Sequence, residues 1–222
     1  MKKIYQIAVI LVLFCNNGTL EAQITSSHLM PVNGIFGIYD SQFEYYSKVR
    51  KVLFNGLTNK PEIRFLVMPA FTPENVLDIE CVGGKCYIIY HICEKNIGRN
   101  TNWEKVKVIK FKSEIDSESV RLIKSLFEIA TAQVRYPDRI INQDGWETIT
   151  IGFDGVNYYF STFIDAHGVR MGMVWSPNKG SKMERLVMIG DKLIELVKSE
   201  KKRVTFDAEL RKSIENLIEE LK

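Results

Sequence analysis

Residues 146–197 decide the fold, and they read WETITIGFDGVNYYFSTFIDAHGVRMGMVWSPNKGSKMERLVMIGDKLIELV. As far as Trp175, apolar residues alternate with polar ones, which is typical of strands that bury one face. Beyond Ser181 the apolar residues recur at the spacing of a helix. The stretch therefore predicts three antiparallel strands followed by one amphipathic helix.

Two turns set the predicted strand register. Asp154-Gly155 separates two alternating runs and indicates a two-residue type I′ hairpin, because both of its positions need a positive φ. Residues 165–168 form the second turn, which places Ile164 opposite Val169. One face of the pleat is then apolar and predicted to be buried: Ile149, Ile151, Phe153, Val156, Tyr158, Phe160, Val169, Met171, Met173 and Trp175. The other face is mostly polar and is predicted to see solvent.

Helices are predicted at four start signals, which are Ser41, Asp116 or Ser117, Ser181 and Asp207. Both Ser41 and Ser181 precede a glutamate by three positions, which is the capping-box pattern. Each signal is followed by apolar residues at helical spacing. Further strands are predicted over residues 62–68, 76–82, 85–92 and 103–112.

Strands followed by helices predict an α+β fold, with an antiparallel meander sheet or sheets packed against long amphipathic helices. Residues 23–135 and 136–222 show a similar order, a strand meander and then a long helix. Their identity is low, so a recurring motif explains the likeness as well as duplication does. No long Pro/Ser-rich linker is present, and residues 23–222 are therefore predicted to form a single domain.

The first 22 residues predict a cleaved signal peptide. Lys2-Lys3 gives a positive start, and residues 7–14 are apolar but too short to span a membrane. The protein is therefore expected to be exported, either periplasmic or secreted. Lipidation of Cys15 is an alternative, although the bulky Phe14 stands where lipoproteins carry a small residue. No later segment is apolar over a membrane-spanning length.

Three cysteines follow the predicted signal, and an exported chain meets an oxidising compartment. The turn at Gly83-Gly84 places Cys81 directly opposite Cys86, which predicts a cross-strand disulfide. Two reduced thiols are the alternative. Cys93 is left over, and the spacing does not match a metal site.

Charge and composition limit the partner. The chain is 45% apolar, and its net charge of +3 is too small to indicate nucleic acid. A stripe of lysines at positions 105, 107, 110 and 112 is typical of a solvated face or a protected edge strand. A surface for an anionic partner is the alternative.

No familiar catalytic or cofactor-binding motif occurs, and no cofactor is expected. Asp165 and His167 have the chemistry of a general base with an orienting carboxylate, although turn formation explains both equally well. Gly180, Ser181 and Lys182 precede a helix and suggest an anion site, although capping accounts for the serine.

The predicted solvent-facing side of the strands carries Tyr159, Phe163 and Arg170, residue types that are favoured at partner interfaces. The leading hypothesis is an exported, non-catalytic binding or interaction module for a macromolecule or small ligand of the cell envelope. A small hydrolase that uses Asp165 and His167, and a secreted protein inhibitor, are the alternatives.

Overall fold

The structure, a computed structural model, describes residues 27–32, 41–136 and 155–222, all of which belong to one compact unit. The predicted signal peptide, Cys15 and the strand expected before Asp154 lie outside the described residues. The described strands are β1 (Met30–Pro31), β2 (Ile63–Pro69), β3 (Asn75–Val82), β4 (Lys85–Cys93), β5 (Val108–Ile115), β6 (Val156–Ile164), β7 (Gly168–Trp175) and β8 (Arg203–Val204). The described helices are α2 (Ser41–Leu53), the 3₁₀ helix η1 (Trp103–Lys105), α3 (Ser117–Ala132), α4 (Lys182–Lys198) and α5 (Ala208–Leu221).

One sheet contains all eight described strands, in the order β1-β7-β6-β2-β3-β4-β5-β8. Every neighbouring pair is antiparallel except β5 and β8. The predicted α+β class is confirmed. Pairing of β2 with β6 joins the strands of residues 23–135 to those of 136–222, so the two meanders share one sheet.

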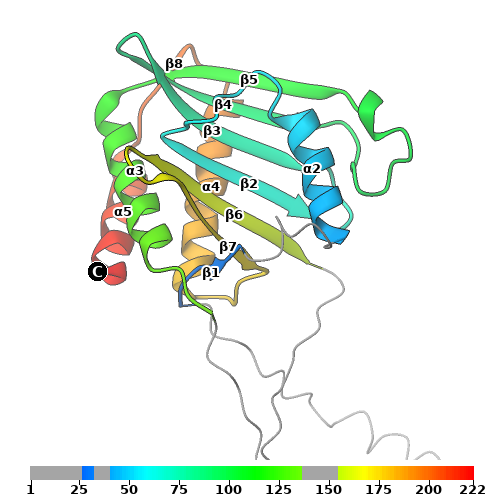
Figure 1. The fold of residues 1–222 in the computed structure, drawn as a ribbon. Helices are drawn as coiled ribbons and strands as arrows, with labels where there is room; N and C mark the ends of the chain where they lie inside the picture. The colour runs from blue at the N-terminus through cyan, green and yellow to red at the C-terminus, as the bar shows by residue number, and fades with distance from the viewer. Residues whose placement is uncertain (1–26, 33–40, 137–154) are drawn as a thin grey trace, which may run out of the picture. The chain divides into compact units, whose positions relative to one another are not determined.

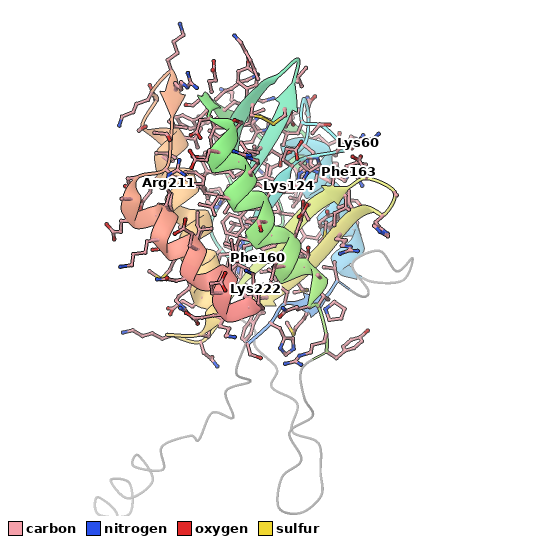
Figure 2. The ribbon with its side chains drawn as sticks, turned by 90° about the vertical axis from the view of Figure 1, so that its left-hand side faces the viewer. Lys60, Lys124, Phe160, Phe163, Arg211 and Lys222 are labelled. Atoms are coloured by element: carbon pink, nitrogen blue, oxygen red, sulfur yellow. A yellow bond between two sulfur atoms is a disulfide. The ribbon has the colours of Figure 1, made fainter. Side chains whose placement is uncertain are left out.

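Helices cover both faces of the sheet (Figure 1). The larger core lies between the sheet and α3 and α4, and α5 packs against these two helices. Phe65, Phe127 and Phe160 meet at its centre (Phe160 is labelled in Figure 2). Gly190 lets α4 approach the sheet, because a Cβ there would lie 2.5 Å from the Phe65 ring. On the other face, α2 buries Tyr46, Val49 and Leu53.

Three of the predicted helix starts are confirmed as N-caps. Asp116, Ser181 and Asp207 each accept a hydrogen bond from the main-chain N–H three residues later, at 2.8–3.0 Å. Such a cap contributes about 1 kcal/mol to stability. The fourth helix, α2, begins at Ser41 as predicted, but the side chains of its first three residues lie outside the described atoms.

The register predicted for the Asp154-Gly155 hairpin is wrong. Both edges of β6 are occupied, by β2 and by β7, and Tyr158 pairs with Val67 and Val174 instead of Ile151. All residues of β2 are buried, so this strand needs a partner on each side, and β6 is one of them. A turn signal reports only on neighbours in sequence and misses such a long-range pair.

The predicted pairing of Ile164 with Val169 is also wrong. The loop is one residue shorter than predicted, so Ile164 faces Gly168, and the main chain at Ala166 has a φ of 68°. This shift moves the apolar residues of β7 by one position. Met171 and Met173 therefore lie on the α2 side, while Val174 lies with Phe160 on the α4 side.

The predicted strand over residues 103–112 is half right. Residues 103–105 form η1, and β5 begins only at Val108 and extends to Ile115. Lys107, Lys110 and Lys112 are exposed, as the stripe predicts.

The predicted disulfide is confirmed. Cys81 faces Cys86 across β3 and β4, their sulfurs are bonded, and Gly83 and Gly84 both have positive φ in the turn between them. We expect a double serine variant at the two positions to lose about 2 kcal/mol of stability, because the bond closes only a short loop. Peptide mapping without reductant should recover the two cysteines as one linked pair, and alkylation of both before reduction would contradict this.

Candidate functional site: the lysine-lined end of the sheet

The structure places Asp165 and His167 in the exposed turn between β6 and β7. The His167 N–H donates to the carbonyl of Ile164 at 3.1 Å, which closes the turn. Neither residue lines any of the grooves described below. Turn formation accounts for both residues.

Tyr159, Phe163 and Arg170 are not brought together. Tyr159 is 3% exposed and packs edge-on against Tyr46 beneath α2, with ring centroids 6.1 Å apart. The Lys60 ammonium lies 5.2 Å from the Phe163 ring centroid (Figure 2). Arg170 pairs with Thr162 on the opposite face of the sheet, a consequence of the register shift.

The helix start at Gly180, Ser181 and Lys182 already holds an anionic group. The Glu184 carboxylate accepts from the Gly180 N–H, and the Ser181 hydroxyl accepts from the Glu184 N–H. The Lys182 ammonium donates to the Glu220 carbonyl. An external anion at this helix end would compete with the carboxylate of Glu184.

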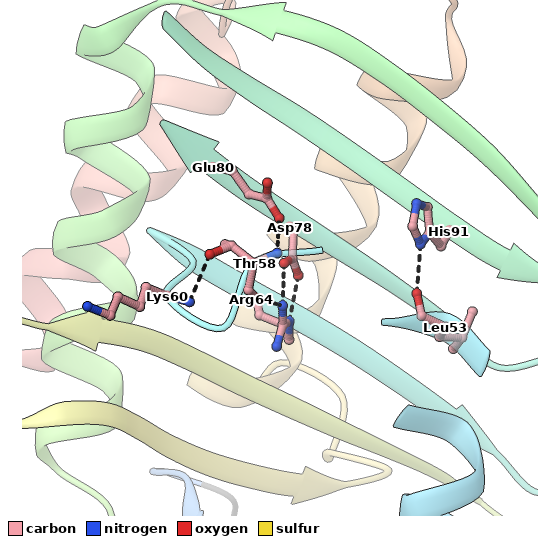
Figure 3. A network of polar contacts seen from close by, with 7 residues as sticks. All are labelled: Leu53, Thr58, Lys60, Arg64, Asp78, Glu80 and His91. Carbon is pink, nitrogen blue, oxygen red and sulfur yellow. Dashed lines mark hydrogen bonds and ion pairs between the residues drawn. The ribbon is translucent and has the colours of Figure 1, made fainter. Parts of the chain in front are cut away.

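A buried ion pair fixes the loop after α2 (Figure 3). The Arg64 guanidinium donates to both oxygens of Asp78, at 2.7 and 2.5 Å, and to the Thr58 carbonyl at 2.7 Å. Glu80 accepts from the Thr58 N–H at 2.6 Å. Burial raises the pKa of Asp78 to about 6, and the guanidinium opposes this rise. These groups are engaged with one another and hold residues 54–62 on the sheet.

Glu74 holds the loop that follows β4. Its carboxylate is fully buried and accepts from the Tyr45 hydroxyl at 2.6 Å and from the N–H groups of Ile97 and Gly98 at 2.8 and 3.2 Å. Burial, and then the bond to Glu74, raise the pKa of Tyr45. The carboxylate thus ties α2 and residues 94–102 to β3.

His91 anchors the end of α2 in the same way. Its Nδ1 lies 2.7 Å from the Leu53 carbonyl, to which it donates (Figure 3). Burial lowers the pKa of His91, which favours the neutral ring.

These anchors support a set of seven lysines, here called the lysine surface, which lies on α2, η1 and β5 and on the segments beside them. Its members are Lys48 and Lys51 of α2, Lys95, Lys105 of η1, and Lys107, Lys110 and Lys112 in and before β5. The ammonium groups of Lys48 and Lys51 lie 5.9 and 5.2 Å from the Trp103 ring centroid. Such contacts add about 0.5–1 kcal/mol each at exposed sites.

Positive charge is concentrated on this surface. Only Lys48 and Lys51 of the seven form an ion pair with a described residue, namely Glu44 at 2.6 Å and Glu104 at 2.9 Å. Glu94 is a third carboxylate on the same surface. Glu114 follows Lys112 on the same face of β5, so seven lysines stand against four glutamates, an excess of three, and the whole chain carries a net charge of only +3. The excess charge of the chain is thus found at this end of the sheet, where it attracts anions.

Two grooves run along the lysine surface, on either side of Val106. One, of about 350 Å³, lies between α2 and the start of β5 and is lined by Lys51, Trp103 and Lys110. The other, of about 410 Å³, is lined by Lys95, Lys105 and Lys107. The first also has the apolar side chains of Val52, Val106 and Val108, whereas Val106 is the one apolar side chain of the second. Each groove contains one glutamate, Glu104 in the first and Glu94 in the second. They suit a ligand that carries negative charge and some apolar surface.

A third groove, of about 620 Å³, lies between α4 and α5. Its floor is apolar, with Ile189, Leu196 and Leu210. The charges on its rim are balanced: Arg185, Lys192, Lys201, Glu195, Asp207 and Glu209. This groove therefore selects no charge class of ligand.

The sequence stripe revealed four of the seven lysines. It gave no sign that Lys48, Lys51 and Lys95 would join them, because that depends on how α2 and residues 94–102 dock on the sheet. The position of Trp103 beside Lys48 and Lys51 depends on the same packing.

Cys93 is buried, and its thiol is expected to react slowly. It is a free thiol, 2% exposed, and burial raises its pKa to about 12. At pH 8 its alkylation by iodoacetamide in the native protein should be at least about a hundredfold slower than in denaturant, because the thiolate is the reactive form. Comparable rates in the two states would show that the thiol is accessible.

Comparison with protein-family models, with curated proteins and with solved structures found no match for this chain. Within the described ranges, no helix has the length and apolarity needed to cross a membrane. The same ranges contain no group of three or more His, Cys, Asp or Glu side chains placed to hold a metal ion. A function must therefore be argued from the geometry of the lysine surface.

Proposed function

We propose that this chain is an exported, non-catalytic interaction protein that binds an acidic partner protein through the lysine surface. The observation that carries the proposal is the concentration of seven lysines on α2, η1, β5 and the segments beside them, in a chain whose net charge is only +3. Complementary charge steers a partner to the surface and selects among partners.

Export to an oxidising compartment is part of the proposal. It is supported by the signal-like pattern of residues 1–22 and by the Cys81–Cys86 disulfide, since such bonds persist mainly outside the reducing cytosol. The binding role is supported by the structural role of the buried charged groups, which bond to one another and to loops. Arg64, Asp78 and Glu74 hold loops in place, and the lysines stand exposed on the framework they support.

The function is tested by fluorescence anisotropy with a labelled peptide of alternating glutamate and valine, about eight residues long, the length of an ordinary strand. Binding should weaken as ionic strength rises, because exposed charges further apart than the Debye length, about 10 Å at 0.1 M salt, are screened. A matched peptide of lysine and valine should not bind.

Two outcomes would overturn the proposal. One is equal binding of the acidic and basic peptides. The other is binding of a sulfated polysaccharide with no binding of the acidic peptide, which would assign the lysines to a different class of macromolecule.

A further inference from the structure

Strand β5 has a long free edge. On its outer side it pairs with β8 only at Glu114 and Ile115, and no other described strand lies beside it. Figure 1 shows β5 along the margin of the sheet, with β8 at one end. The Ser113 hydroxyl donates to the Lys201 carbonyl at 2.7 Å, so the segment before β8 reaches Ser113. Residues 108–112 are the part of this edge that is open to main-chain pairing.

The direction of the main-chain groups follows from one hydrogen bond. The Glu114 N–H donates outward to the Lys202 carbonyl at 3.0 Å. Alternate residues of a strand point their main-chain groups the same way, so those of Val108, Lys110 and Lys112 also point outward. Three outward N–H and C=O pairs are a template for an added strand.

The β5 edge is regular, and only its charged side chains oppose pairing with another strand. Its register with β4 runs unbroken from Cys86 opposite Ile115 to Cys93 opposite Val108, without a bulge or a proline. At the opposite margin of the sheet, β1 covers part of β7. Lysines on the β5 edge repel a second copy of the same strand, but they attract an acidic one.

We propose that an extended segment of the acidic partner adds to the sheet as a ninth strand beside β5. This inference rests on the proposed function and specifies how the partner is held. Lys110 and Lys112 project on the α2 side of the strand, whereas Ile109, which is 47% exposed, and Phe111 project on the α4 side. The added strand therefore alternates acidic residues with apolar ones.

The test distinguishes the contribution of the main-chain hydrogen bond from that of the side-chain charge at one position, Lys112. Lys112→Gln removes only the ammonium group, while Lys112→Pro also removes the outward N–H. Proline is tolerated on an edge strand whose N–H faces solvent, so both variants should fold, which circular dichroism checks. The proline variant should bind the glutamate–valine peptide about tenfold more weakly than the glutamine variant.

Hydrogen exchange gives a second measurement that needs no variant. Saturation of the wild-type protein with the peptide should slow exchange of the Lys110 and Lys112 N–H groups at least tenfold. Equal affinities of the two variants, or unchanged exchange at both amides, would overturn strand addition. If the peptide still bound in a salt-dependent way, the charge-based function would stand without it.

Discussion

Asp78→Ala should lower the free energy of unfolding by about 3–5 kcal/mol, because it leaves the buried Arg64 guanidinium without its carboxylate. Urea denaturation measures the change. The matched control is Glu195→Ala, which breaks the exposed Lys192–Glu195 pair and should cost less than about 1 kcal/mol.

Removing both buried charges should restore most of this loss. The raised pKa of Asp78 indicates that desolvation outweighs the attraction of the guanidinium. An Arg64→Leu, Asp78→Leu double variant should therefore lie within about 2 kcal/mol of the wild type, since apolar replacement of a buried pair is often close to neutral. If Asp78→Ala lowered the free energy of unfolding as little as Glu195→Ala does, the Arg64–Asp78 pair would not be desolvated, and the explanation would be contradicted.

Glu74→Ala should lower the free energy of unfolding by about 2–3 kcal/mol. It leaves the buried Ile97 N–H without an acceptor, which costs about 1–3 kcal/mol, and it removes the bonds from the partly buried Tyr45 hydroxyl and from the Gly98 N–H, which contribute less. Exchange of the Ile97 amide should accelerate at the same time, because its acceptor is lost.

The control for Glu74 is the exposed Glu94, which lies in the segment that Glu74 anchors. Glu94→Ala should change stability by less than about 0.5 kcal/mol. Equal effects of the two substitutions would contradict the anchoring role of Glu74. Because residues 94–102 support the lysine surface, Glu74→Ala should also weaken binding of the acidic peptide, whereas Glu94→Ala should not.

Local signals in the sequence predicted the parts of the fold that depend on near neighbours. The double glycine at positions 83 and 84 specified the hairpin and, through its register, the Cys81–Cys86 bond. Asp116 and Ser181 marked helix starts through the hydrogen bonds that they accept. In each case the deciding contact spans five residues or fewer.

Contacts between distant residues escaped prediction. The pairing of β6 with β2 brings Tyr158 beside Val67, and no turn or periodicity reports such a contact. The loop after Ile164 was predicted one residue too long, because Ala166 adopts a positive φ that its sequence does not signal. That one residue reversed the faces of β7 and separated Arg170 from Tyr159.

The candidate site was visible only in part for the same reason. A stripe of lysines along one strand can be seen in the sequence, but its meeting with Lys51 and Trp103 depends on tertiary packing. The buried partners that hold this arrangement, Glu74 directly before β3 and His91 within β4, carry no distinctive sequence signal.

The most direct test of the lysine surface compares two double variants of equal net charge. Lys107→Gln with Lys112→Gln neutralises the surface, and Lys198→Gln with Lys212→Gln removes the same charge from α4 and α5. The first pair should weaken binding of the glutamate–valine peptide at least about tenfold, and the second by less than about twofold. Equal weakening by both pairs would show that the peptide responds to net charge alone, and it would contradict a binding site on the lysine surface.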